Sequence, residues 1–182
     1  MLSNEKIEQA YNETFAGLTL YYRDCDLKEE LIDNYQLGQI ILEPGFTDVS
    51  SYAEGLGKNF RYAIASNDAA DMSQFNPAVE KWGFHLINAG AYFKVLDIYK
   101  LEDKTQILLL HFSEQNMEAF KTVKSNMEDQ VIEKARKSLD TKIKLETSAE
   151  LYAAEWLKRT REPLGMNGEG EFFLKWFSFT LA

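Results

Sequence analysis

Apolar positions along the middle of the chain follow a pattern that predicts paired β-strands. Residues 92–101 carry apolar side chains in both phases of the strand alternation, so both faces of this strand are expected to be covered. After a short polar connection at 102–104, residues 105–112 form a nearly unbroken apolar run, which is typical of a central strand. We therefore predict that 92–101 and 105–112 pair as a hairpin in which Leu108 and Leu110 are buried.

Shorter apolar runs extend the predicted sheet. Residues 84–87 precede Gly90, which permits the positive φ of a tight loop, so the runs between 84 and 112 are expected to form a three-stranded antiparallel meander. Residues 60–66 alternate in the way of a fourth strand. Two weaker patterns complete the set: a brief strand or buried connector at 39–42, and a charged edge strand at 141–146.

Apolar side chains spaced three and four residues apart predict helices that cover the sheet. This spacing, with capping residues and glycine stops, places helices at 3–18, 27–37, 48–57, 113–139 and 149–160, and a helical turn that begins at Asn76 and Pro77. Residues 172–181 fit either a strand or a helix, and their aromatic density favours a strand. The predicted fold class is α+β: a single domain over 1–182, with an antiparallel sheet of four to six strands packed against helices.

Composition and charge narrow the classes of function. The 182 residues are 45% hydrophobic and 13% aromatic, which is enough for one large core. A net charge of −9 argues against a nucleic-acid or anionic-membrane partner, because such binding depends on clustered lysines and arginines. Cys25 has no second cysteine with which to form a disulfide, and no apolar run approaches a membrane span, so a cytoplasmic protein is expected.

Catalytic candidates are few. His85 and His111 lie in predicted strands, and with an acid such as Asp68 or Asp71 either is suited to acid–base work. The histidines and cysteine lack the spacing of a metal site, so neither a metal nor another cofactor is expected. A histidine at a sheet end with one hydrogen bond is the favoured interpretation of both. Cys25 lies between two aspartates, which raise the pKa of a thiol and make it a poor nucleophile.

The long polar connection at 67–82 is the segment most expected to carry function, because long loops in compact domains are usually functional. Its acidic and aromatic side chains predict a binding face made by Asn67, Asp68, Asp71, Gln74, Phe75 and Trp82. The first hypothesis is therefore a non-catalytic binding or regulatory protein with a basic protein partner, or a homo-oligomer joined through the basic cluster at 134–144. The alternatives are a small hydrolase that uses the 67–71 acidic loop with a histidine, and a small-molecule binder with an aromatic cavity.

Overall fold

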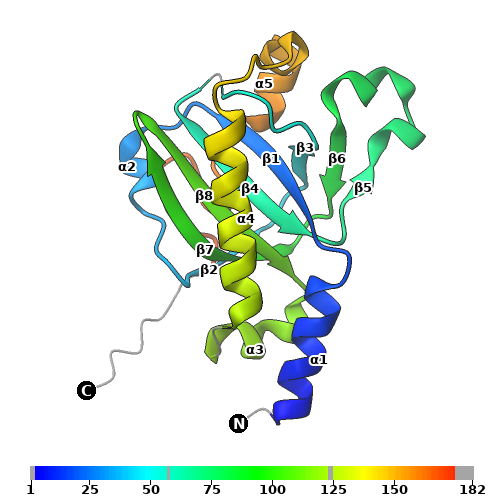
Figure 1. Cartoon of the computed structure of the whole chain (residues 1–182), viewed down its shortest axis with the longest axis vertical. Coiled ribbons are helices and arrows are strands. Elements are labelled where there is room, and N and C mark those ends of the chain that lie inside the picture. The colour runs from blue at the N-terminus through cyan, green and yellow to red at the C-terminus, as the bar shows by residue number, and fades with distance from the viewer. Residues whose placement is uncertain (1–2, 57, 123–124, 175–182) are drawn as a thin grey trace.

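A mixed sheet of eight strands forms the centre of the computed structural model, which describes residues 3–56, 58–122 and 125–174 (Figure 1). Its strands are β1 Thr19–Cys25, β2 Ile40–Glu43, β3 Thr47–Ser50, β4 Phe60–Ser66, β5 Ala70–Asp71, β6 Phe84–Ile87, β7 Ala91–Leu101 and β8 Lys104–Phe112. They lie in the order β2-β7-β8-β4-β1-β3-β6-β5, and all neighbours are antiparallel except β4 and β8, which are parallel. The α+β class is confirmed, whereas the expected antiparallel sheet of four to six strands is too small and misses the parallel pair.

The predicted hairpin is confirmed by the pairing of β7 with β8. Leu108 and Leu110 are both fully buried, as the apolar run predicts. The expected meander is wrong in one pairing, because β6 bonds to β3 and β5 and not to β7. The alternation at 84–87 specifies a strand, but the neighbour of that strand depends on β3 and β5, which the sequence pattern did not identify.

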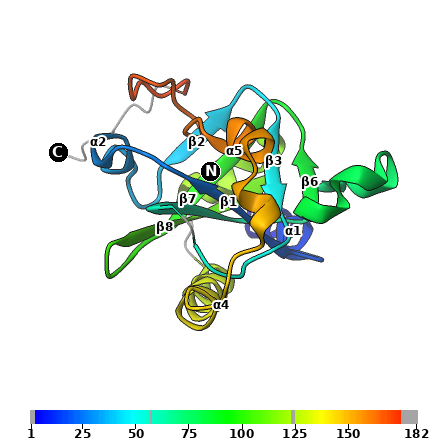
Figure 2. The same ribbon diagram turned by 90° about the horizontal axis from the view of Figure 1, so that it is seen from above.

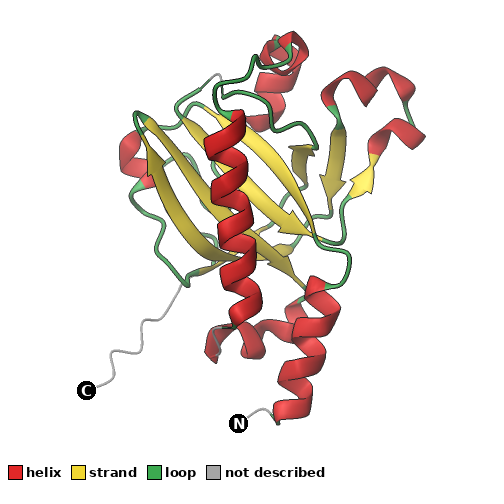
Figure 3. Ribbon diagram, viewed as in Figure 1, coloured by secondary structure: helices red, strands yellow, loops and turns green. Residues whose placement is uncertain are grey.

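Helices lie on both sides of the sheet and at its ends (Figures 2 and 3). The α-helices are α1 Asn4–Phe15, α2 Glu29–Ile32, α3 Met117–Thr122, α4 Asn126–Lys142 and α5 Ala154–Thr160, and the 3₁₀ turns are η1 Met72–Gln74, η2 Pro77–Trp82, η3 Glu114–Asn116 and η4 Ala149–Tyr152. The first helix is confirmed, and so is the turn at Pro77, where the Asn76 side chain accepts a hydrogen bond from the Ala78 amide.

Four of the predicted elements differ from the structure. The single helix expected at 113–139 is divided into η3, α3 and α4. The helix expected at 48–57 is replaced at its start by β3, which pairs with β1 and β6. The helix expected at 27–37 shrinks to α2. The edge strand expected at 141–146 is instead the end of α4 and a turn, because the last turns of α4 bury Leu139 against the rest of the protein and the helix runs on to Lys142.

Both faces of the sheet are buried, and on β4 the two faces carry side chains of different size. The large side chains of Tyr62 and Ile64 belong to one core cluster, and the small side chains of Ala63 and Ala65 belong to the other. The face that bears these alanines meets α1, α3 and α4, where Ala135 of α4 is fully buried. Figure 2 shows α4 on one side of the sheet.

The segment predicted as a polar loop at 67–82 is partly ordered into β5, η1 and η2, which project as an arm beside β6 (Figure 1). At its base, Trp82 and Phe84 pack against Trp156 of α5 and form a third, smaller core cluster. Of the tail predicted as a strand, Phe172 forms a β-bridge with Met166, and 175–182 lie outside the described residues. Within the described ranges, no helix is long and apolar enough to cross a membrane.

Candidate active site

A polar cleft opens where β4 and β8 end side by side, and we name it the His111 cleft. Its volume is about 410 Å³, within the range of about 300 to 1,000 Å³ that is usual for small-molecule sites. It is lined by Glu13, Thr14, Asn67, Asp68, Asn88, Ala89, Gly90, Ala91, Tyr92, His111, Phe112, Ser113, Glu114, Gln115 and Asn116. The end of α1, the loop after β4, the β6–β7 turn and η3 therefore meet at one place.

The parallel pairing of β4 with β8 brings two polar residues together at the base of this cleft. Ala65 lies opposite Leu110 in the ladder, so the next residues, Ser66 and His111, leave the two strands as neighbours. Ser66 Oγ lies 2.9 Å from His111 Nδ1, and Ser66 is fully buried. The ring of His111 is thus held by a hydroxyl that water does not reach.

Two further hydrogen bonds hold the loop that follows β4. The backbone amide of Asp68 donates to Ser66 Oγ at 3.1 Å. The side-chain amide of Asn67 donates to the carbonyl oxygens of Glu13 at 2.7 Å and of Ala16 at 3.1 Å, at the end of α1. The loop is therefore held to the end of β4 on one side and to α1 on the other.

The carboxylates that line the cleft are not balanced by basic side chains in the described part of the lining. Glu13, Asp68 and Glu114 contribute carboxylates, and none of the described lining residues is a lysine or an arginine. Burial lowers the pKa of His111 below its usual value, and the nearby Asp68 carboxylate opposes part of this shift. Burial raises the pKa of Tyr92, and so does the hydrogen bond that its hydroxyl donates to Glu114.

The structure separates the four catalytic candidates into two pairs. Asp68 and His111 line the His111 cleft, whereas His85 and Asp71 face each other on β6 and β5, outside it. His85 Nδ1 lies 2.9 Å from the Gly83 carbonyl oxygen, and its ring packs against Tyr21. The Asp71 carboxylate accepts hydrogen bonds from the hydroxyl and amide of Ser73, which lower its pKa. His85 and Asp71 thus have local structural partners.

The predicted binding residues do not form one face. Asn67 and Asp68 belong to the His111 cleft, while Gln74 and Phe75 are exposed on the arm. Trp82 is 2% exposed, and its indole donates to the Glu150 carbonyl oxygen, so its expected place on a binding surface is wrong. Its ring packs on Trp156, which places Trp82 in a core cluster.

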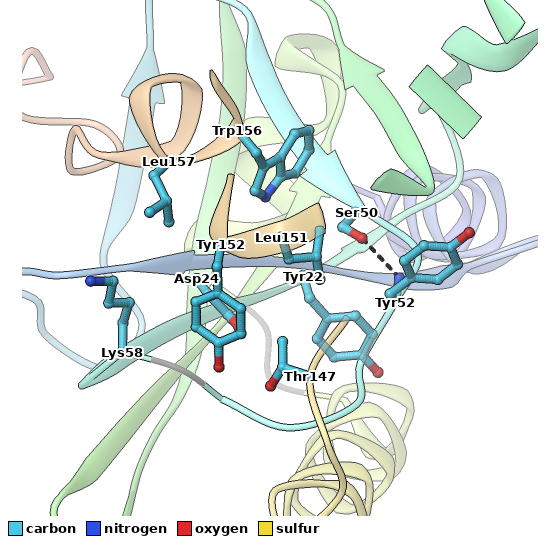
Figure 4. A pocket seen from close by; sticks show the side chains of 10 residues that line it. All are labelled: Tyr22, Asp24, Ser50, Tyr52, Lys58, Thr147, Leu151, Tyr152, Trp156 and Leu157. Carbon is cyan, nitrogen blue, oxygen red and sulfur yellow. Dashed lines mark hydrogen bonds between the residues drawn. The ribbon is translucent and has the colours of Figure 1, made fainter. Parts of the chain in front are cut away.

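A second hollow lies between η4, α5 and the face of β1, and we name it the Trp156 pocket (Figure 4). It is lined by Tyr22, Asp24, Ser50, Tyr52, Lys58, Thr147, Leu151, Tyr152, Trp156 and Leu157. Its volume is about 10 Å³, which is scarcely the space of one water molecule. The carboxylate of Asp24 is also occupied, because both of its oxygens accept hydrogen bonds from Arg61. The residues in Figure 4 therefore fill their pocket themselves.

Three residues of the His111 cleft were not predicted from the sequence. Glu13, Tyr92 and Glu114 come from three different elements, and no spacing along the chain connects them with His111. Among the described residues, no group of three or more histidine, cysteine, aspartate or glutamate side chains is arranged to hold a metal ion.

Solved structures whose chains are similar to parts of this chain include three bacterial proteins, two named as ADP-ribosyltransferases and one as an exoenzyme. The ADP-ribosyltransferase Vis from Vibrio splendidus matches with a TM-score of 0.43 and 14% identity over 53% of this chain and 49% of its own. The ADP-ribosyltransferase HopU1 of Pseudomonas syringae gives 0.45 and 17% over 52% and 45%. Exoenzyme S from Pseudomonas aeruginosa gives 0.46 and 13% over 70% and 62%. No family model and no curated protein sequence matches the chain.

These neighbours correct one expectation from the sequence. They are named as enzymes, which contradicts the hypothesis of a non-catalytic protein-binding module. The matched segment spans about half the length of Vis and HopU1. The similarity assigns no role to any residue of this chain, so the chemistry of the site is derived below from its own side chains.

Proposed function

We propose that this chain is an enzyme in which Asp68 accepts a proton and the neutral ring of His111 donates a hydrogen bond, on a small polar substrate held in the His111 cleft. The observation that supports this most directly is the 2.9 Å hydrogen bond between Ser66 Oγ and His111 Nδ1. It fixes the imidazole beside a carboxylate in a cleft of suitable size, where a positioned base and a positioned hydrogen-bond donor can act on the same substrate.

The hydrogen bonds of Ser66 set the tautomer of His111. The Ser66 hydroxyl oxygen already accepts the Asp68 amide hydrogen, and His111 is its other partner among the described residues. A buried hydroxyl that accepted from both groups would leave its own hydrogen unpaired, at a cost of about 1 to 3 kcal/mol. The hydroxyl therefore donates to Nδ1, and the neutral imidazole carries its proton on Nε2. Since burial lowers the pKa of His111, this neutral form is the main one near pH 7.

Asp68 is suited to the role of the base. Its carboxylate has no hydrogen bond or ion pair with any residue in the described part of the chain, unlike that of Asp71. The Asp68 backbone is fixed by the hydrogen bond from its amide to Ser66 Oγ, so the carboxylate extends from an anchored position. A carboxylate without a partner in the cleft remains free to accept a proton from a bound substrate.

The lining also limits the substrate. Three carboxylates and no described lysine or arginine disfavour phosphates and other anions, because nothing offsets their charge. The side-chain amides of Asn88, Gln115 and Asn116 offer hydrogen bonds to hydroxyl and amine groups. An uncharged polyhydroxylated molecule or a cation therefore fits the cleft better than a nucleotide does.

Transfer of ADP-ribose, the activity named for Vis and HopU1, has requirements that neither hollow meets. A donor such as NAD carries two phosphates, and cleavage of its glycosidic bond develops positive charge that a free carboxylate stabilises. The His111 cleft supplies carboxylates without a described cation for the phosphates. The Trp156 pocket lacks room, and its Asp24 carboxylate is bound to Arg61. We therefore expect neither of these two sites to release nicotinamide from NAD.

The test is a turnover screen of the purified chain and two variants. The panel contains aldoses, ketoses, neutral and amine-bearing esters, glycosides and NAD. We expect one of the neutral or cationic classes to be converted, and His111→Asn to reduce its turnover by about 10² to 10³-fold, as loss of a positioned hydrogen-bond donor to the transition state does. His85→Asn is the matched control, because His85 lies outside the cleft.

Three results would contradict the proposal. They are turnover that survives His111→Asn, turnover that falls equally in His85→Asn, and no conversion of any member of the panel. Nicotinamide release that is insensitive to His111→Asn would favour ADP-ribose transfer over the proposed chemistry and would place the reaction elsewhere in the fold.

A further inference from the structure

We infer that Asn67 is a positioning residue of this site, through which docking of α1 sets the geometry of Asp68 and His111. The inference rests on the proposed function, because it assigns the roles of donor and acceptor to those two residues. Asn67 itself is exposed, and the role that we infer for it involves no contact with the reacting atoms.

The first step is the contact between Asn67 and α1. The last carbonyl groups of a helix have no partners within the helix, and they must be satisfied from outside. At the end of α1, the side-chain amide of Asn67 donates to the carbonyl oxygens of Glu13 and Ala16 at 2.7 and 3.1 Å. A residue 51 positions away from Ala16 in the chain thus caps the helix.

The second step leads from Asn67 to the two groups that act on the substrate. Its chain neighbours are Ser66, which holds the His111 ring, and Asp68, the proposed base. No more than one peptide unit separates Asn67 from either of them. A shift of the Asn67 backbone therefore moves the Asp68 amide relative to Ser66 Oγ and changes the hydrogen bond that fixes the His111 tautomer.

The third step is that α1 touches the opposite wall of the cleft as well. Asn116 of η3 donates to the Glu13 carboxylate at 3.4 Å, a weak contact from the segment that follows β8. The buried ring of Tyr11 on α1 also packs against Phe120 of α3. The last turn of α1 therefore lies between the loop after β4 and the segment after β8, and Figure 1 shows the end of α1 at this edge of the sheet. Asn67 connects the end of α1 to Ser66 and Asp68, because its side chain binds the helix and its backbone joins those two residues.

The experiment compares Asn67→Ala and Asn67→Asp with Asn34→Ala in the full chain. Asn67→Asp keeps the shape of the side chain but removes both donors. Asn34 is an exposed asparagine outside the cleft whose side-chain amide also donates to a backbone carbonyl oxygen, that of Gly170. Two readouts are taken by NMR: hydrogen exchange of the Asp68 amide and the titration of the His111 ring. Where the screen has supplied a substrate, kcat and KM are measured separately.

We expect both Asn67 variants to speed exchange of the Asp68 amide at least tenfold, to shift the His111 titration, and to lower kcat more than they raise KM. Asn67→Gln, which keeps the donors on a longer side chain, should restore part of each effect, and Asn34→Ala should change none of them. Unchanged exchange and titration in Asn67→Asp would overturn the inference.

The outcomes also separate this inference from the proposed function. If His111→Asn abolishes turnover while the Asn67 variants leave kcat and the titration unchanged, the proposed function stands and the role of Asn67 is wrong. If the Asn67 variants shift the titration but turnover does not depend on His111, the coupling is real and the proposed chemistry is wrong.

Discussion

Ser66 and His111 lie 45 residues apart in the sequence, yet Ser66 Oγ and His111 Nδ1 are 2.9 Å apart. The parallel pairing of β4 with β8 creates this contact, because both strands reach the same edge of the sheet at the same level. The candidate site is therefore a product of the two central strands, and its integrity depends on the core beneath it.

The core beneath the site is tested by Leu110→Ala. Leu110 is fully buried on β8, one residue before His111. Loss of its side chain should lower the free energy of unfolding by about 2 to 5 kcal/mol, as large-to-small core substitutions do. Urea denaturation is the measurement, and Leu145→Ala, at a side chain that is 51% exposed, is the control. A loss below about 0.5 kcal/mol, the scale of surface substitutions, would show that this core is misplaced.

The ion pair between Arg61 and Asp24 predicts a large effect of a small change. Arg61 is 1% exposed and donates to both oxygens of Asp24. Asp24→Asn leaves the guanidinium buried without a counter-charge, so the free energy of unfolding should fall by about 3 to 5 kcal/mol. Glu54→Gln removes a partner from the exposed pair with Lys142, where about 0 to 1 kcal/mol is expected. Equal losses in the two variants in urea melts would contradict this account.

The single cysteine, Cys25, should be unreactive toward thiol reagents in the folded protein. Burial raises the pKa of Cys25 to about 12, and its thiol donates to the Thr160 carbonyl oxygen. Because the thiolate is the reactive form, a disulfide reagent at pH 8 should leave the native chain unmodified and should label it at once in denaturant. Rapid labelling of the native protein would show that the segment around Thr160 leaves Cys25 open to solvent.

The lowered pKa of His111 predicts the direction of one pH effect on stability. The folded state binds this proton less readily than the unfolded chain, whose histidine pKa is about 6.5. The unfolded state therefore takes up more protons below that pH, and stability decreases as the pH falls through about 6.5. Urea melts at pH 7.5 and 5.5 should show this loss in the wild type and a smaller loss in His111→Asn. An equal loss in both would assign the pH dependence to other groups.

Prediction from the sequence succeeded where one segment determines its own structure. The apolar run at 105–112 specified β8 and its buried face, and Asn76 with Pro77 specified the start of η2, because each signal is local. Prediction failed where the structure of a segment depends on the strands with which it pairs. The alternation at 84–87 did not reveal that β6 pairs with β3, and the pattern at 48–57 looked helical although Val49 and Ser50 belong to a strand.

The same distinction explains the site. Asp68 and His111 were candidates because of their chemistry. Their proximity follows from the parallel pairing of β4 with β8, which no pattern in the sequence predicts. Glu13 and Glu114 join them only through the positions of α1 and η3. Trp82 was assigned to the surface because its segment is polar, whereas the fold supplies Trp156 to cover it.

The pairing of β4 with β8 also bears on the order of folding. A parallel pair cannot form from a tight turn, and here the two strands are joined through the arm, β6 and β7, so a long loop must close before the pair is made. Contacts of this range form slowly compared with those of a hairpin such as β7–β8. A newly made chain is therefore expected to acquire its helices and hairpin first, and to pass through a stage that is largely compact but has no assembled Ser66–His111 pair.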